Sequence, residues 1–186
     1  MIKNVVFDMG NVLVAYDENR TCRQFMEEGT EEYDRVKAAV FGSQEWVLLD
    51  MGVISEEEGL RRMKNRLRRE REEELAEKCF LHWHEFCMWT VEGAEQVIRD
   101  LKAKGYGIYL CSNASVRLRT CYREYIPAVD CFDGILFSAE EKLLKPQKEI
   151  YQRLFEKFGL KPEECFFVAS RSKYNFHIVK PEGRYY

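Results

Sequence analysis

Four short apolar runs, rich in β-branched and aromatic residues, are separated by longer stretches in which apolar residues recur at helical spacing. Runs of this length are typical of strands buried in a parallel sheet, and they lie at residues 2–7, 105–111, 134–137 and 165–168. The longer stretches predict helices at residues 91–104, 115–125 and 147–158. Strands that alternate with helices in this way indicate βαβ units. The sequence therefore predicts an α/β fold built on a doubly wound, mostly parallel, Rossmann-like sheet.

The segment between the first two runs has a different pattern and no convincing strand. Its apolar residues follow helical spacing in four stretches, at residues 21–28, 31–41, 55–67 and 72–86. Ser55 and Glu58 form a capping box, which is the signature of a helix N-terminus. We therefore divide the chain into three parts: a core (residues 1–16 and 90–168), an inserted helical-bundle cap (residues 17–89) and a divergent C-terminal tail (residues 169–186). Beside a site at the strand ends, the cap would act as a lid, or it would only bury core surface.

Composition and charge argue against a nucleic-acid-binding or membrane protein. The net charge is −3, and the basic residues at 61–69 are followed at once by acidic residues at 70–74, which is typical of a solvated helix face. No stretch approaches the roughly 18 apolar residues of a membrane span. Seven cysteines, an odd number without a CxxC pair, in a chain with no signal peptide predict reduced thiols and a cytoplasmic protein. The oligomeric state stays open.

The most informative residue is Asp8, which ends the first apolar run. A carboxylate at the carboxyl end of a parallel strand lies where open α/β sheets bind their ligands. Gly10, two residues later, lets the backbone turn and approach a ligand closely. Two interpretations follow from this spacing: Asp8 is a nucleophile or metal ligand, or it merely caps the loop after the strand.

Further polar groups occupy matching places in the pattern. Ser112 and Asn113 follow the second run, and Lys145 precedes the helix at 147–158. Because the carboxyl ends of parallel strands meet at one edge of the sheet, we expect these groups to converge on Asp8. The set suits a phosphoryl group, since the carboxylate can attack, the hydroxyl and backbone N–H groups can hold oxygens, and the ammonium offsets negative charge.

The stretches around these residues carry a family resemblance. Residues 5–14 (VVFDMGNVLV), residues 110–113 (LCSN) and Lys145-Pro146 stand in the order of three sequence motifs, and residues 49–55 (LDMGVIS) form a fourth stretch inside the insertion. Together they resemble the haloacid-dehalogenase-like hydrolase superfamily, in the subgroup with a small helical cap after the first strand. The resemblance runs over residues 2–168 and is to members such as the bacterial phosphatases that act on glucose-1-phosphate.

The resemblance implies a phosphatase that acts on a small phosphorylated metabolite such as a sugar phosphate. Asp8 would attack phosphorus and form an aspartyl-phosphate that water then hydrolyses, with Mg²⁺ bound to Asp8 and to the Gly10 backbone carbonyl. Ser112, Asn113 and Lys145 would bind the phosphate, and Lys145 would also act in catalysis by neutralising charge. Four side chains of the cap region would contact substrate, although they also fit ordinary cap packing: Tyr16, Arg20, Trp46 and Asp50.

The sequence departs from the family pattern at two places. Gly10 stands where many phosphatases of the superfamily have a second aspartate as general acid and base, so the proton donor is unassigned. Ala169 and Ser170 stand where the family has two acidic residues that complete the Mg²⁺ site. Because Mg²⁺ is usually bound through one or two carboxylates, we expect weakened metal binding and impaired turnover.

These departures leave two alternatives open beside an active phosphatase. One is a catalytically inactive relative that binds a phosphorylated ligand or a protein partner. The other is a haloacid dehalogenase, which uses an aspartate nucleophile and needs no Mg²⁺.

The end of the chain does not continue the family pattern. The match stops abruptly after Val168, which predicts that the final βα unit is truncated or altered, for example by a frameshift. The linker is too short for a helical crossover, so residues 176–179 would form a short antiparallel edge strand, or the tail would be disordered.

Overall fold

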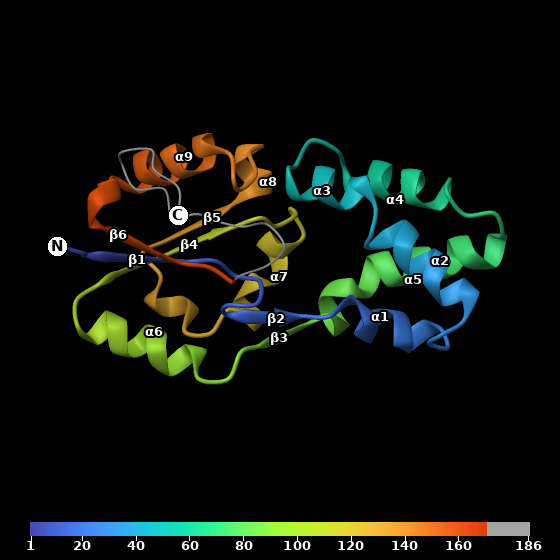
Figure 1. The fold of residues 1–186 in the computed structure, drawn as a ribbon, viewed down its shortest axis with the longest axis horizontal. Helices are drawn as coiled ribbons and strands as arrows, with labels where there is room; N and C mark the ends of the chain where they lie inside the picture. Colours follow the sequence, from blue (N-terminus) through green and yellow to red (C-terminus); the bar gives the residue numbers. More distant parts are fainter. Residues whose placement is uncertain (171–186) are drawn as a thin grey trace.

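The computed structural model describes residues 1–170, which form an α/β core and a helical cap that lie side by side (Figure 1). The cap is an insertion, because the chain leaves the core near Tyr16 and returns near Met88. The expected edge strand at residues 176–179 and the altered final βα unit lie outside the described residues.

A four-stranded parallel sheet forms the centre of the core. Its strands lie in the order β5 (Gly134–Phe137), β4 (Gly107–Ser112), β1 (Asn4–Phe7) and β6 (Cys165–Val168). In the register of the sheet, Val6 of β1 lies between Tyr109 and Phe167. The four strands predicted from the apolar runs are confirmed, and β1 is an inner strand of the sheet.

Helices cover both faces of this sheet (Figure 1). They are α6 (Ala94–Ala103) and α7 (Leu118–Tyr125) on one face, and α8 (Ser138–Glu141) and α9 (Lys148–Phe158) on the other. Short 3-10 helices precede β5 and β6, at Val129–Cys131 and Pro162–Glu164.

Successive side chains of a strand point to opposite faces. Val5 and Phe7 accordingly share a buried cluster with Ile98 of α6. Val6 instead packs in the cluster that contains Ile150 of α9. The predicted doubly wound α/β fold is confirmed.

The cap is a bundle of helices, which are α1 (Glu18–Phe25), α2 (Glu31–Val40), α3 (Gln44–Asp50), α4 (Glu56–Lys64) and α5 (Glu70–Phe86). All except α3 correspond to predicted helices, with ends displaced by a few residues. The seven residues of α3 are too few to display a helical period, so the pattern did not predict it. The Ser55 hydroxyl accepts the Glu58 N–H at 3.1 Å, as the capping box predicts. Within residues 1–170, no helix has both the length and the apolar character needed to cross a membrane.

A two-stranded antiparallel ribbon joins the cap to the core. β2 (Val14–Tyr16) pairs with β3 (Met88–Thr90), so that both crossings between core and cap lie side by side. The expectation that residues 17–89 contain no strand was wrong at Met88 and Trp89. A three-residue strand shows no alternation that a sequence pattern could register, and this one forms only because its partner lies next to it in space.

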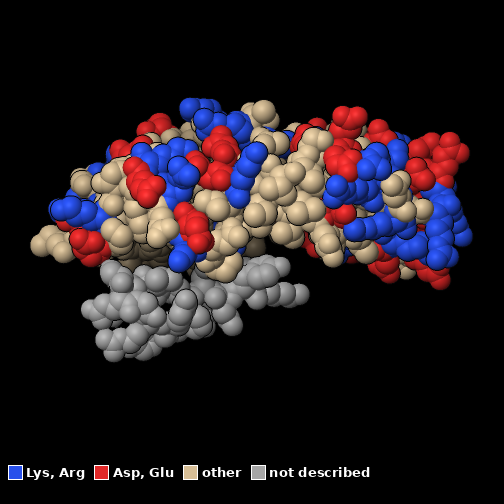
Figure 2. All heavy atoms as spheres, turned by 90° about the horizontal axis from the view of Figure 1, so that it is seen from above, with Lys and Arg blue, Asp and Glu red and all other residues tan. Residues whose placement is uncertain are grey.

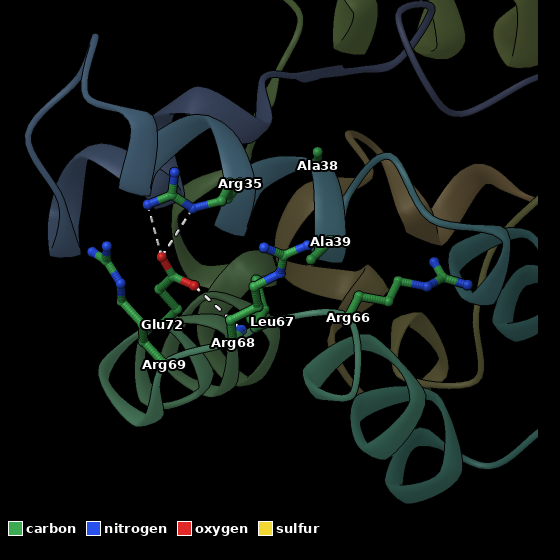
Figure 3. A pocket seen from close by; sticks show the side chains of 8 residues that line it. All are labelled: Arg35, Ala38, Ala39, Arg66, Leu67, Arg68, Arg69 and Glu72. Carbon is green, nitrogen blue, oxygen red and sulfur yellow. Dashed lines mark hydrogen bonds and ion pairs between the residues drawn. The ribbon is translucent and has the colours of Figure 1, made fainter.

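Charged side chains of both signs are interspersed on the face of the cap that Figure 2 shows. Glu72 of α5 is a buried exception, with 1% of its side chain exposed in an arginine-lined pocket (Figure 3). Its carboxylate accepts hydrogen bonds from the Arg35 guanidinium at 2.9 Å and from the Arg68 N–H at 3.5 Å. Burial raises the pKa of Glu72, but these hydrogen bonds outweigh burial and keep the pKa below its usual value. The carboxylate thereby ties α2 to the segment that enters α5.

The turn after α3 docks the cap onto the core. Gly52 has a φ of +70°, and a Cβ atom at this position would lie 2.1 Å from the Ala139 carbonyl oxygen of α8. The Ser138 hydroxyl donates to the Asp50 carbonyl and accepts the Ala114 N–H at 2.8 Å. Glycine at position 52 is required both by the backbone conformation and by this close approach.

We expect Gly52→Ala to lower the free energy of unfolding more than Gly29→Ala does. Both glycines have positive φ, +70° and +84°, so an alanine costs about 1–2 kcal/mol at either position. The Cβ atom meets backbone at position 52 and nothing within 4 Å at position 29, and overpacking adds about 1–3 kcal/mol. Urea denaturation of the two variants measures the difference. Equal losses would contradict the docking role of Gly52.

Candidate active site

The loop after β1 presents Asp8 at the carboxyl edge of the sheet. The Asp8 N–H donates to the Val168 carbonyl of β6 at 2.8 Å, and its Oδ1 accepts the Met9 N–H at 2.7 Å. The chain then reverses through Asn11, which has a φ of +56°, and the Val14 N–H returns to the Met9 carbonyl at 3.0 Å. These bonds fix the carboxylate at the end of the strand and leave it 18% exposed.

Lys145 reaches Asp8 from the segment before α9. Its Nζ lies 2.7 Å from Asp8 Oδ1 and donates to the Cys111 carbonyl at 2.9 Å, and only 7% of its side chain is exposed. The Asn113 side chain holds the Lys145 backbone from both sides, because its Oδ1 accepts the Lys145 N–H at 2.8 Å and its Nδ2 donates to the Lys145 carbonyl at 3.0 Å. Asn113 therefore positions the ammonium group of Lys145 through the backbone.

A pocket of about 620 Å³ between core and cap contains these groups. Asp8, Ser112, Asn113 and Lys145 line its core side, so the structure brings together the side chains that the sequence placed at separate strand and helix ends. Ser112 is 2% exposed, and its hydroxyl donates to the Asn113 carbonyl at 3.4 Å. A carboxylate, an ammonium and a hydroxyl thus share one concave site, and this set suits a phosphoryl group.

The donors available to a Mg²⁺ ion are few. Gly10 and Ser170 line the pocket with Asp8, and the Ser170 hydroxyl donates to the Gly10 carbonyl at 3.4 Å. Ala169 has no side-chain oxygen. Among the described residues, no group of three or more His, Cys, Asp or Glu side chains is arranged to hold a metal ion. One carboxylate, one carbonyl and one hydroxyl therefore form an incomplete oxygen set for an ion that prefers octahedral coordination.

Two other acidic residues of the core, Asp130 and Asp133, form ion pairs away from this site. Asp130 pairs with Arg99 at 3.2 Å, and Asp133 pairs with Lys102 at 2.6 Å. Asp133 also accepts the Ile108 N–H, which places it at the amino end of β4, opposite the edge where Asp8 lies. Neither carboxylate replaces the acidic residues missing at positions 169 and 170.

Three of the four predicted cap-region residues line the pocket, namely Tyr16, Trp46 and Asp50. Arg20 is not among the lining residues, and its guanidinium carbon lies 4.4 Å from the centre of the exposed Trp89 ring. The spacing of residues in a helix cannot show which face turns toward the pocket, and the tertiary packing turns Arg20 away from it.

Asp50 is an unusual carboxyl group within this pocket. Burial raises its pKa to about 7, although a hydrogen bond from the Ser115 backbone acts in the opposite direction. Burial and the nearby Cys87, Glu18 and Asp50 together raise the pKa of Tyr16 well above its ordinary value. The Asp50 carboxyl group is therefore partly protonated near neutral pH, beside the edge of the core where Asp8 lies.

A comparison with protein families agrees with this geometry. A family model described as haloacid dehalogenase-like hydrolase matches residues 2–171. This chain belongs to the haloacid dehalogenase-like hydrolase family. This membership confirms the resemblance that the sequence motifs carry. The chain is a hydrolase of this family and has the α/β core described above.

Two phosphatases are among the relatives of this haloacid dehalogenase-like hydrolase. A D-ribitol-5-phosphate phosphatase of Bacteroides thetaiotaomicron is 27% identical over 190 residues, which cover 98% of this chain and 89% of that protein. A sesquiterpene phosphatase of Aspergillus oryzae is 30% identical over 79 residues, which cover 40% of this chain and 38% of that protein.

The fold is also found among solved structures. A haloacid-dehalogenase family enzyme of Bacteroides thetaiotaomicron, in complex with magnesium and inorganic phosphate, has a TM-score of 0.68 and 21% identity. The alignment covers 90% of this chain and 84% of that one. This likeness shows that the two chains share the fold.

The sequence motifs assign no role to Ser138, which the structure places between cap and core. Ser138 is the first residue after β5, just as Asn113 is the first residue after β4. The available signal in the sequence was a serine at the carboxyl end of a third parallel strand. Its hydroxyl, however, binds the Asp50 carbonyl and the Ala114 N–H, which are far away in the sequence.

We expect Asp50→Asn to become more stable relative to the unaltered protein as the pH rises from 4 to 7. The folded protein raises the pKa of Asp50 to about 7, so the fold disfavours the charged form. The stability that the neutral form contributes is complete below the unfolded pKa and is lost as the pH rises through 7. Thermal unfolding of both proteins from pH 4 to 8 should show a difference in the free energy of unfolding that grows by roughly 4 kcal/mol up to pH 7 and then stays constant. The exposed Asp34→Asn serves as control, and an equal pH dependence in that variant would refute the assignment.

Proposed function

We propose that this chain hydrolyses a small phosphate monoester through an aspartyl-phosphate formed on Asp8. The observation that carries the proposal is the 2.7 Å pair between Asp8 and Lys145 inside a pocket that Ser112 also lines. In the reaction, a carboxylate oxygen of Asp8 bonds to phosphorus while the alcohol oxygen leaves. Water then attacks the aspartyl-phosphate, releases inorganic phosphate and regenerates the carboxylate.

The residues around Asp8 support this chemistry electrostatically. The Lys145 ammonium, which is nearly buried, offsets the negative charge that two anions bring together when phosphate approaches a carboxylate. The Ser112 hydroxyl lies on the same lining of the pocket and would bind a phosphate oxygen. Low solvent exposure strengthens each of these interactions relative to water.

Mg²⁺ is the cofactor that we propose, held by Asp8, the Gly10 carbonyl and the Ser170 hydroxyl, and completed by phosphate and water oxygens. A bound Mg²⁺ would neutralise charge on the phosphoryl group. The solved structure of a family member with magnesium and phosphate supports this choice. With a single carboxylate among the described donors, we propose that the affinity for the free ion is low and that turnover is impaired.

Sugar phosphates are the first esters to assay, since the sequence resembles glucose-1-phosphate phosphatases and one relative is named for ribitol 5-phosphate. The partner would then be a small phosphorylated metabolite, without a role for nucleic acid or membrane. Gly10 offers no side chain that could protonate the leaving oxygen. Besides Asp8, the described lining of the pocket contains one further carboxyl group, that of Asp50.

Replacement of Asp8 tests the proposal directly. We expect Asp8→Asn to lower phosphate release by roughly 10³-fold or more, because an amide cannot act as the nucleophile. Acid-quenched unaltered enzyme should carry a phosphoryl group on the peptide that contains Asp8, as measured by mass spectrometry. The exposed Asp34→Asn should retain both signals.

Each alternative has its own outcome in the same assay. Halide release from a 2-haloacid without Mg²⁺ would identify a dehalogenase. Ligand-induced thermal stabilisation without any turnover or phosphoryl adduct would identify an inactive phosphate-binding relative.

The missing carboxylates predict that Ser170→Asp tightens Mg²⁺ binding. We expect isothermal titration to give at least a tenfold lower dissociation constant for this variant, because it adds a second carboxylate beside Asp8 (roughly 1.4 kcal/mol for each factor of ten). Ser170→Asn has the same size without the charge and should change the constant much less. A low micromolar dissociation constant in the unaltered protein would contradict the proposed weakening.

A further inference from the structure

The cap side of the catalytic pocket is an aromatic wall. The Trp46 ring centre lies 5.1 Å from that of Phe41 and 5.3 Å from that of Trp83, and Tyr16 continues the row at 6.4 Å from Trp83. All four side chains line the pocket that contains Asp8. Val47, one position beyond Trp46 on α3, adds an aliphatic side chain in a residue that is 50% exposed. The leaving group of a bound phosphate ester would face this surface.

Several polar side chains on the same wall already have partners within the protein. The Ser43 hydroxyl donates to the Val40 carbonyl at 3.0 Å, and the Tyr16 hydroxyl is hydrogen bonded to the Cys87 thiol. The Asp50 carboxyl group accepts a hydrogen bond from the Ser115 backbone. The indole N–H groups of Trp46 and Trp83 and the remaining capacity of the Asp50 carboxyl group are then the side-chain partners on this side for the several hydroxyl groups of a polyol or sugar, which is fewer than such an alcohol carries.

Positive charge is also confined to the phosphate end. Among the described residues that line the pocket, Lys145 is the only lysine or arginine, and it lies against Asp8. A second phosphate or a carboxylate on the leaving group would therefore face Asp50 and aromatic rings without a cation to pair with. Burying such a charge, or a set of unpaired hydroxyl groups, against this wall costs free energy that is not offset by an ion pair or by enough hydrogen bonds.

We propose that the alcohol released by this enzyme is uncharged and apolar, an aliphatic or aromatic alcohol in place of a sugar. The inference rests on the proposed phosphatase function, and it departs from the sugar phosphates that the ribitol-5-phosphate phosphatase suggests as first substrates. The core side of the pocket binds the phosphoryl group, and the aromatic wall of the cap removes the carbon skeleton of the alcohol from water.

A series of straight-chain alkyl phosphates from ethyl to hexyl phosphate, compared with ribitol 5-phosphate, tests the proposal. All are esters of primary alcohols, which keeps the leaving oxygen chemically similar. We expect kcat/KM to rise about fourfold for each added methylene that the wall covers, which follows from the transfer of a methylene out of water. Hexyl phosphate should then exceed both ethyl phosphate and ribitol 5-phosphate by at least tenfold (the same transfer scale).

Two valines of similar exposure provide a matched pair of variants. Val47 lines the pocket and is 50% exposed, whereas Val53 is 48% exposed and is not among the lining residues. Val47→Gln should flatten the dependence of kcat/KM on chain length, because it puts an amide on the apolar wall. Val53→Gln should leave that dependence as it is in the unaltered protein.

Binding to the Asp8→Asn variant separates failure of this inference from failure of the proposed function. Dissociation constants of the same esters, measured by calorimetry, should fall with chain length even without turnover. A flat series, or tighter binding of ribitol 5-phosphate than of hexyl phosphate, would overturn the apolar leaving group while phosphate release and the Asp8 adduct still supported a phosphatase. Esters that bind with rising affinity but are never hydrolysed would overturn the phosphatase function and retain the apolar pocket.

Discussion

The ion pair between Asp8 and Lys145 is the interaction on which the candidate active site depends. Two charges that are only 18% and 7% exposed are costly to bury, and the cost is offset only where both are well paired. The Cys111 carbonyl accepts a second hydrogen bond from the ammonium, and the Asn113 side chain fixes the backbone that carries it. Two neighbouring strands and the segment before α9 are thereby held at one edge of the sheet.

The pocket above this edge has two unlike halves. Its core side has the charged and hydroxyl groups that suit a phosphoryl group, whereas its cap side is built from Phe41, Trp46 and Trp83. The division follows from how the two parts fold. Strand ends expose backbone and polar loop residues, while helices of a small bundle turn their apolar faces inward, and one such face closes over the site. Gly52 and Ser138 hold the two halves in contact.

The departures at Gly10, Ala169 and Ser170 act on different parts of the chemistry. Gly10 still offers a carbonyl oxygen but no side chain, so proton transfer has to involve another group. Ala169 and Ser170 leave Ser112 and Lys145, the proposed phosphate-binding groups of the other motifs, in place and reduce the negative charge available to a cation. We therefore propose that this set of residues binds a phosphate ester better than it binds a free divalent ion.

The sequence by itself determined the four core strands, the inserted helical cap and the convergence of Asp8, Ser112 and Lys145, because strand length, helical period and the topology of parallel sheets are local or general rules. It did not determine α3 or the β2–β3 ribbon, since these elements are too short to show a period in the sequence. It did not determine the role of Ser138 either, because the groups that Ser138 binds are far away in the chain. The tertiary structure also decided that Arg20 stacks on Trp89, that Asn113 holds the Lys145 backbone, and that Asp50 is buried enough to raise its pKa to about 7. Burial and direction of a side chain depend on what packs against it, and that information is absent from any single stretch of sequence.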